Sequence, residues 1–363
     1  MNWLSCGDFL YIGIRMKLKI TMIISVLAVM IWTAGCGKEA EKSYTEQGFA
    51  AIESLEYEQS LGLFEQALVS GEDEREICRG QGIAYLGLTD YEGAIANFER
   101  CLQISSSIPD NMVYDINYYL ATAYYKAGRI QDAKGVYDAI LGLREKEPDA
   151  YYMRGSVLLE LGDYEAAKQD FDKATELACT DYDQLVAIYE VLEKFGYREV
   201  GNEYLERALA DNAKEMSNYD KGRMYYYLED YESARNYLEQ ARDAGDAQAA
   251  YYLGRTWESL GEYNYAASVY SSYLKDQEKS ALIYNQLALC QMQLKEYDVA
   301  LNAIEEGLAL EDASLKQTLC FNQIVIYEYK GEFEKAASLM ASYVKNYPDD
   351  LEAQREYEFL KTR

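Results

Sequence analysis

The sequence contains no histidine in 363 residues. This absence excludes histidine-based catalytic triads, histidine-ligated zinc sites and imidazole acid–base chemistry. Proline is also scarce, at 3 residues, whereas roughly 5% is usual, and this scarcity favours long uninterrupted helices. With 49% hydrophobic residues the chain can bury a sizeable core. The composition therefore favours a folded helical protein over an enzyme.

Basic residues are few compared with acidic ones. Lys and Arg number 35 against 62 Asp and Glu, which gives a net charge of −27. Such a charge repels the phosphates of nucleic acids and the headgroups of anionic lipids. We therefore expect no nucleic-acid partner. A protein or peptide partner is expected to be basic, because the acidic field would speed its encounter with the chain.

Motifs that carry cofactor chemistry are absent as well. Gly80-Gln81-Gly82 lacks the third glycine of a dinucleotide-binding loop, and no CxxC, HExxH or EF-hand loop occurs. Acidic runs such as Glu72-Asp73-Glu74 are typical of solvated helix surfaces rather than of metal sites. We predict no catalytic residue, no metal site and no cofactor. Only a deep pocket with two facing carboxylates of raised pKa would favour an enzyme.

The seven cysteines do not suggest a disulfide framework, because those in the body of the chain are odd in number and irregularly spaced. Cys78 lies near the start of one predicted helix and Cys101 near the end of the next, antiparallel one. Two interpretations of this pair stay open. It forms a single disulfide in an extracytoplasmic compartment, or its members are buried thiols in place of small core residues.

Residues 15–36 carry three parts of an export signal. Three basic residues within 15–19 precede an uncharged apolar stretch at 20–32, and Thr33-Ala34-Gly35-Cys36 then supplies small residues ending in a thiol. The apolar stretch is too short for a spanning helix, which needs about 20 apolar residues. It is typical of the core of a signal peptide.

This arrangement resembles the lipobox of bacterial lipoproteins, although Thr33 stands where leucine is more typical. The resemblance implies a signal peptide at 1–35, lipidation of Cys36, and a location on the extracytoplasmic face of the cell membrane, held there by the lipid. Met16 is a more natural start of translation than Met1, so we expect residues 1–15 to be an upstream extension. The alternatives are an uncleaved signal anchor or a cytoplasmic scaffold without a signal. Cleavage would change the net charge to −29, which leaves the lipid as the only membrane anchor.

A short pattern recurs about every 34 residues. It is an acidic residue, an aromatic residue, a polar residue, any residue and then alanine. Each unit is expected to contain two helices, the second capped by the acidic residue. Because one helix pair cannot bury its apolar face alone, neighbouring pairs must stack into a solenoid. The pattern ends at Ala94, Ala167, Ala234, Ala266, Ala300 and Ala336.

This period and pattern resemble the tetratricopeptide repeat. The resemblance implies an all-α, right-handed α-solenoid of about nine helix-turn-helix repeats over 41–350, after a linker at 36–40 and before a capping helix at 351–363. A joint near 243–254 looks like that of Sel1 repeats. The eighth residue of each repeat is small, except for Tyr189 and Ile324. The twentieth position is small in every repeat: Ser60, Ala94, Ala133, Ala167, Gly201, Ala234, Ala266, Ala300 and Ala336.

The same resemblance implies where a partner binds. In this family the first helix of each repeat lines a concave groove, and tyrosine and arginine are the residue types enriched at binding hot spots. A scaffold that holds an extended peptide or a helix of another protein is therefore expected. Two alternatives stay open: surplus tyrosine that only packs between helices, and an envelope assembly factor whose tyrosines stack on polysaccharide or peptidoglycan. The implied groove residues are Tyr118, Tyr125, Tyr152, Tyr219, Arg223, Tyr226, Tyr227, Tyr251 and Arg255.

Overall fold

The computed structural model describes residues 42–105, 109–212, 214–310 and 312–363. In these residues the chain forms nineteen α-helices, α2 to α20, and no β-strand. The predicted all-α repeat fold is confirmed. The predicted signal peptide, Cys36 and the linker that follows it lie outside the described residues.

The described residues divide into two compact units, with the boundary between Tyr204 and Leu205. The first unit contains α2 (Tyr44–Glu53), α3 (Tyr57–Val69), α4 (Glu74–Gly87), α5 (Tyr91–Gln103), α6 (Asn111–Lys126), α7 (Ile130–Leu143), α8 (Pro148–Glu160), α9 (Tyr164–Leu177) and α10 (Tyr182–Lys194). Helix α11 (Arg198–Asn212) spans the boundary between the units. The second unit contains α12 (Asn218–Tyr227), α13 (Tyr231–Asp243), α14 (Ala249–Ser259), α15 (Tyr263–Asp276), α16 (Ala281–Gln293), α17 (Tyr297–Leu308), α18 (Ala313–Lys330), α19 (Phe333–Asn346) and α20 (Leu351–Leu360).

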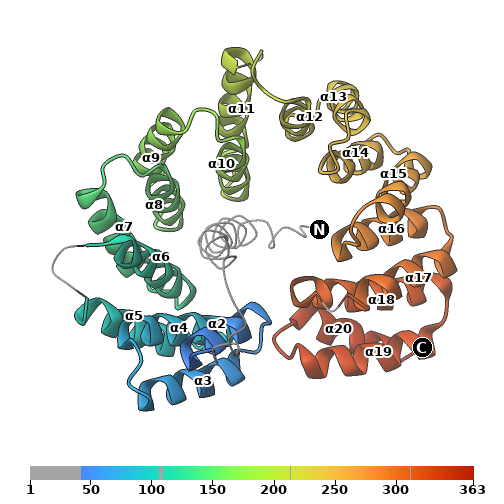
Figure 1. The fold of residues 1–363 in the computed structure, drawn as a ribbon. Helices are drawn as coiled ribbons and strands as arrows, with labels where there is room; N and C mark the ends of the chain where they lie inside the picture. The colour runs from blue at the N-terminus through green and yellow to red at the C-terminus, as the bar shows by residue number, and fades with distance from the viewer. Residues whose placement is uncertain (1–41, 106–108, 213, 311) are drawn as a thin grey trace, which may run out of the picture. The chain divides into compact units, whose positions relative to one another are not determined.

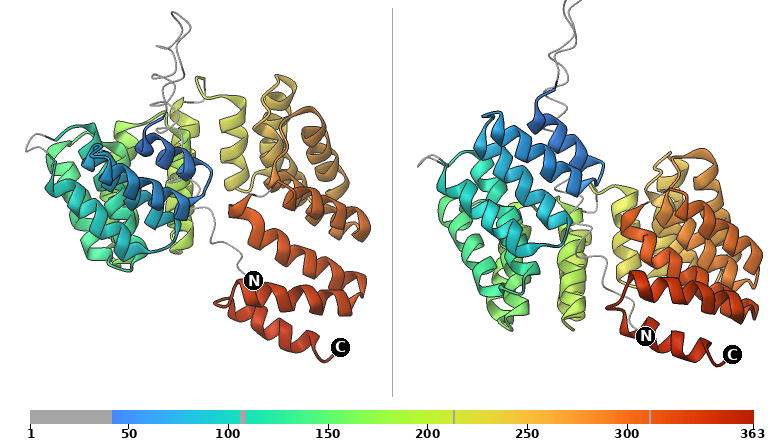
Figure 2. Two further views of the ribbon diagram at one scale, coloured as in Figure 1. Left: turned by 60° about the horizontal axis from the view of Figure 1, so that its bottom comes forward. Right: turned by 90° about the horizontal axis from the view of Figure 1, so that it is seen from below.

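Helices that follow one another pack as pairs, and each pair is one repeat. Helix α4 packs on α5, α8 on α9, α12 on α13 and α16 on α17. The first helices also pack on one another, as α4 does on α6 and α16 on α18. Within each unit this produces one layer of first helices and one of second helices (Figures 1 and 2). The last helix, α20, packs on α19.

A glycine at the eighth position lets the two helices of a repeat cross closely. A Cβ atom on Gly82 would lie 2.4 Å from the ring of Phe98, and one on Gly155 would lie 2.6 Å from the ring of Phe171. Both rings are fully buried. Because carbon atoms in contact stay about 3.5 Å apart or more, no larger residue fits these positions without a shift of the rings.

The fifth repeat accommodates a large residue at its eighth position. This position holds Tyr189, which is 1% exposed, and the twentieth position holds Gly201 where most repeats have alanine. A Cβ atom on Gly201 would lie 2.9 Å from the Tyr189 ring. Glycine at the twentieth position therefore leaves room for the Tyr189 ring, and the helix pair persists although the sequence pattern is broken.

The turn inside every described repeat has one residue with left-handed backbone. This conformation provides a hydrogen-bond donor for a free carbonyl at the end of the first helix. The amide of the residue that follows donates to the carbonyl five residues earlier, as from Asp90 N to Tyr85 O at 3.0 Å. The predicted caps are confirmed at the aspartates, because Asp90, Asp163 and Asp230 accept from backbone amides of the next helix. The prediction is wrong at the glutamates, because Glu262, Glu296 and Glu332 form no side-chain cap hydrogen bond. Five of the left-handed residues are Gly128, Gly162, Gly196, Gly261 and Gly331, and four are Leu55, Thr89, Glu229 and Lys295.

The segment that resembles a Sel1 joint connects α13 to α14. Helix α13 ends at Asp243, Gly245 is left-handed at φ 91°, and α14 begins at Ala249. The Sel1 character of this link stays a prediction.

Candidate partner-binding surfaces

In the first unit, the candidate surface is the face formed by the first helices α4, α6, α8 and α10. We call it the first-helix face. Figure 1 shows these helices on the inner side of the curve of their unit. The predicted groove residues Tyr118 and Tyr125 lie on α6, and Tyr152 lies on α8.

A small solvent-open pocket lies on the first-helix face between α6, α8 and α10. Two predicted groove residues line it. Tyr152 is 2% exposed and forms part of the pocket floor, whereas Tyr125 is half-buried. The complete lining is Thr122, Tyr125, Tyr137, Tyr152, Met153, Ser156, Val157, Val191, Lys194 and Phe195.

The polar groups of the pocket have defined hydrogen-bond partners. Thr122 donates to the Tyr118 carbonyl at 2.9 Å, and Ser156 donates to the Tyr152 carbonyl at 3.0 Å. These hydroxyls therefore serve their own helices, and the remaining lining is mainly aromatic and aliphatic. Such a pocket suits an apolar or aromatic side chain.

One carboxylate connects the three helices around the pocket. The Tyr125 hydroxyl donates to Glu160 Oε1 at 2.7 Å, and Lys194 Nζ lies 3.5 Å from the same oxygen. Glu160 thus bridges α6 to α10 from the end of α8. The sequence prediction includes Tyr125 but not Glu160 or Lys194, although both occupy the thirteenth position of their repeats.

Tyr118 does not line the pocket. Its ring centroid lies 6.2 Å from that of Tyr137, which does line it, and Tyr118 packs against the core of the first unit. This placement makes Tyr118 a support for the pocket wall.

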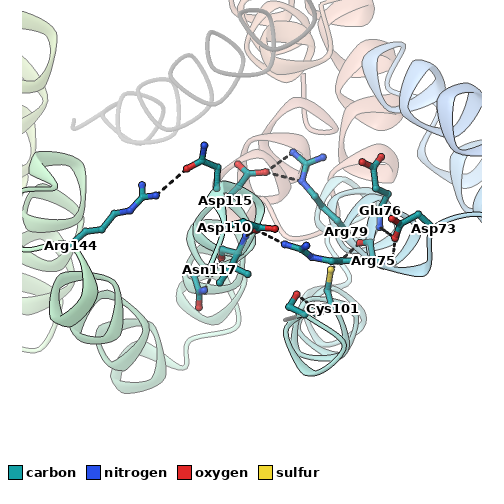
Figure 3. Close-up of polar contacts among 12 residues, drawn as sticks. Asp73, Arg75, Glu76, Arg79, Cys101, Asp110, Asp115, Asn117 and Arg144 are labelled. Carbon is teal, nitrogen blue, oxygen red and sulfur yellow. Dashed lines mark hydrogen bonds and ion pairs between the residues drawn. The ribbon is translucent and has the colours of Figure 1, made fainter. Parts of the chain in front are cut away.

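Two ion pairs extend the same face onto α4 and α6 (Figure 3). Arg79 Nε donates to Asp115 Oδ2 at 2.7 Å, and its guanidinium lies 5.8 Å from the centroid of the Tyr119 ring. Arg75 pairs with Asp110, and this hydrogen bond lowers the pKa of Asp110 to about 2. Sequence reasoning missed the Arg79–Asp115 pair, although the repeat frame puts both residues at groove positions.

In the second unit, five tyrosines from α12 and α14 form a tyrosine cluster with Tyr252 at its centre. The Tyr252 ring centroid lies 5.7 Å from Tyr226 and 5.1 Å from Tyr251. It lies 6.0 Å from both Tyr219 and Tyr227, and its hydroxyl is 3.2 Å from that of Tyr227. Four of the five are predicted groove residues. Tyr252 was missed because it lies one position beyond the frame's fifth position.

Both predicted arginines of the second unit are held in place by carboxylates. Arg223 is 5% exposed, lies 5.0 Å from the centroid of the Tyr219 ring and donates to Asp220 at 2.9 Å. Arg255 donates to Glu258 at 3.0 Å. Burial lowers the pKa of Arg255, but Tyr226 and Glu258 more than compensate, so the pKa is raised overall. Both arginines therefore stay charged.

Glu258 joins three elements of the second unit. It accepts from the Tyr270 hydroxyl of α15 at 2.7 Å and from Arg255, and Cys290 Sγ of α16 lies 3.5 Å away. Burial, together with Glu258, raises the pKa of both Tyr270 and Cys290. The sequence contained an indication of this network. Tyr270 occupies the position at which three other repeats have a buried phenylalanine. A tyrosine hydroxyl that is buried there needs a hydrogen-bond acceptor.

The described residues contain neither a metal-ligating cluster nor a membrane-spanning helix. Within residues 42–105, 109–212, 214–310 and 312–363, no three potential ligand side chains are grouped closely enough to hold a metal ion. In the same part of the chain, no helix combines the length and apolar character that crossing a membrane requires.

Comparison with known proteins identifies the repeat family of this chain. Sequence profiles described as tetratricopeptide repeat match residues 80–108, 118–181, 219–281 and 312–350, together just over half of the chain. BBSome complex member bbs-4 of Caenorhabditis elegans is 25% identical over 216 residues, which are 56% of this chain and 46% of that protein. The chain thus spans about half the length of this relative.

Solved structures with similarity to this chain include two bacterial proteins. A tetratricopeptide repeat protein from Parabacteroides merdae is 14% identical, and the match covers 69% of this chain and 99% of that one, with a TM-score of 0.45. The pilF protein of Pseudomonas aeruginosa is 21% identical, and the match covers 61% of this chain and 100% of that one, with a TM-score of 0.40.

Proposed function

Because the chain is a tetratricopeptide repeat protein, we propose that it is a non-catalytic scaffold that binds a protein partner through the first-helix face of its repeats. The observation that carries this proposal is the pocket between α6, α8 and α10. Its mainly apolar lining suits an anchoring side chain of a partner, and such buried anchors supply most of the affinity of an interface.

The charge of the chain supports a basic partner. The net charge is −27, and Glu160 lies beside the pocket. A segment with an apolar or aromatic anchor flanked by lysine or arginine would fill the pocket and face this acidic surface. Complementary charge chiefly raises the association rate and the selectivity of binding, so binding should weaken at high salt.

The tyrosine cluster of the second unit is a second proposed contact surface. Tyrosine supplies a large apolar area with one hydroxyl, and two charged arginines, Arg223 and Arg255, accompany the rings. Removal of the Tyr227 side chain should weaken partner binding. Tyr265, which is 58% exposed on the second helix α15, offers a matched control.

A lipid anchor at Cys36 is part of the proposal, and its support is the resemblance of residues 15–36 to a lipoprotein signal. The test compares wild type with Cys36→Ala by intact mass and membrane fractionation after expression in a bacterium. A lipid-sized mass increase and membrane retention that are both lost in the variant would support extracytoplasmic anchoring. A soluble, unmodified, full-length wild type would refute the anchor and leave the scaffold function intact.

The scaffold function is tested by filling the pocket. Ser156 is half-buried in the pocket lining, so Ser156→Phe should occupy the space meant for a partner's anchor. Gln169→Phe adds the same ring on the exposed outer surface of α9 and is the matched control. Envelope proteins and isolated cell wall are offered to each variant in parallel. Capture of a protein by wild type and the control but not by Ser156→Phe supports the proposal. Retention on cell wall alone would favour a polysaccharide ligand instead.

A further inference from the structure

Two cysteines from the antiparallel helices of the second repeat lie against one backbone carbonyl. Cys78 is in the second turn of α4, and Cys101 is near the end of α5. The Arg75 carbonyl oxygen is 3.4 Å from Cys78 Sγ and 3.0 Å from Cys101 Sγ. Figure 3 shows Cys101 pointing toward α4 at Arg75. Because both sulfur atoms contact one oxygen, the two thiols are close neighbours.

The two helix ends that carry these thiols are braced. Arg100, the residue before Cys101, forms an ion pair with Glu74 at the start of α4. The Arg75 side chain forms its own pair with Asp110 at the start of α6. The first of these contacts links α4 to α5 at the height of the two cysteines.

The thiols are also unequal in acidity. A hydrogen bond from Cys101 and the charge of Arg100 lower the pKa of Cys78, whereas the contact with Cys78 and burial raise the pKa of Cys101. The other buried cysteine of the described residues, Cys290, contacts Glu258 instead.

We propose that Cys78 and Cys101 form an intramolecular disulfide when the chain folds in an oxidising compartment. The inference rests on the proposed function in one respect, because export would bring the chain to a protein disulfide that acts as oxidant. The thiolate of one cysteine attacks that disulfide, forms a mixed disulfide and releases one thiol of the oxidant. The thiolate of the other cysteine then attacks the sulfur of the first and releases the second thiol. The chain loses two protons and two electrons, and the oxidant becomes a dithiol.

The bond would join the two helices of one repeat. Both residues are fully buried in the folded chain, so the bond must form before packing is complete and is then shielded from reductants. A disulfide that closes a loop of roughly 24 residues strengthens the folding equilibrium by about two orders of magnitude. The bond would stabilise the second repeat most strongly against local opening of its two helices.

The test uses the full chain in mild detergent, refolded in a buffer of oxidised and reduced glutathione. Free thiols are alkylated under denaturing conditions, and the chain is digested with trypsin. The expected product is a linked pair of peptides, 76–79 joined to 101–126, that separates on reduction. Cys290→Ala should keep this pair, whereas Cys78→Ala and Cys101→Ala should lose it. Alkylation of both peptides in refolded wild type would overturn the proposal.

A second readout separates this inference from the location of the chain. Oxidation should raise the thermal midpoint of wild type by several degrees, and the Cys78→Ala/Cys101→Ala double variant should show no such difference. Identical midpoints for oxidised and reduced wild type would contradict the stabilising bond. A linked pair after refolding in a chain that is reduced when isolated from cells would support the disulfide and count against export.

Discussion

Close helix crossing in the seventh repeat provides the sharpest test of the packing. A Cβ atom on Gly254 would lie 2.2 Å from two ring atoms of Tyr270. This ring cannot easily move, because it is fully buried and its hydroxyl donates to Glu258 at 2.7 Å. Gly254→Ala should therefore both strain the crossing of α14 and α15 and weaken the hydrogen bond.

The expected cost follows from three contributions. Overpacking a close contact of this kind costs about 2 to 3 kcal/mol. Weakening a hydrogen bond to a charged carboxylate adds about 1.5 kcal/mol, and alanine returns about 1 kcal/mol through its helix propensity. The net loss is about 3 kcal/mol, which lowers the thermal midpoint of a unit of this size by roughly 6 to 12 °C.

Gly135→Ala is the matched control, because Gly135 lies in helix α7 and a Cβ atom there has no heavy atom within 4 Å. It should gain about 1 kcal/mol. Thermal and urea unfolding followed by circular dichroism at 222 nm measure both variants. A Gly254→Ala variant as stable as wild type would refute the reasoning, since it would mean that the Tyr270 ring yields without cost.

Three further predictions concern other parts of the chain. Thr89→Gly should stabilise the first unit by about 0.5 to 1 kcal/mol in urea unfolding, because Thr89 is β-branched and has φ 61°; a loss of stability would contradict this. Arg154→Leu should cost about 3 kcal/mol in the same assay, because it leaves the 5% exposed Asp170 without the two hydrogen bonds of 2.7 Å that Arg154 donates; a neutral effect would show that the pair is dispensable. Burial and the charge of Glu356 raise the pKa of Glu328 to about 7, so its contribution to stability is full below pH 4.5 and is lost as the pH rises through 7. Glu328→Gln should reduce the fall in thermal midpoint between pH 5 and pH 8, and an unchanged fall would rule Glu328 out as its cause.

Much of the fold could be predicted from the sequence because the repeat pattern encodes packing constraints directly. Small residues such as Ala94 and Ala167 mark helix crossings, and acidic residues such as Asp90 mark helix starts. These are local rules, and they repeat, so nine instances reinforce one another. The exception at Tyr189 could be located in the sequence but not explained from it.

The candidate surfaces were less predictable, since they depend on contacts between repeats. The frame selected Tyr152, but only the structure shows that Tyr137, Val191 and Phe195 join it around one pocket. Likewise, Glu258 resembles any helix-surface carboxylate until Tyr270 is seen beside it. The repeat pattern gives the position of a residue within its own repeat. It does not give the size of the side chains that this residue meets in the next repeat.

The pairing of Tyr189 with Gly201 in the fifth repeat has an evolutionary consequence. Most other repeats combine a small residue at the eighth position with alanine at the twentieth. A chain that moves between the two arrangements by single substitutions must pass through one of two intermediates. Glycine in place of Tyr189 would leave a void beside Gly201, and alanine in place of Gly201 would press against the Tyr189 ring. The two positions are therefore expected to change together.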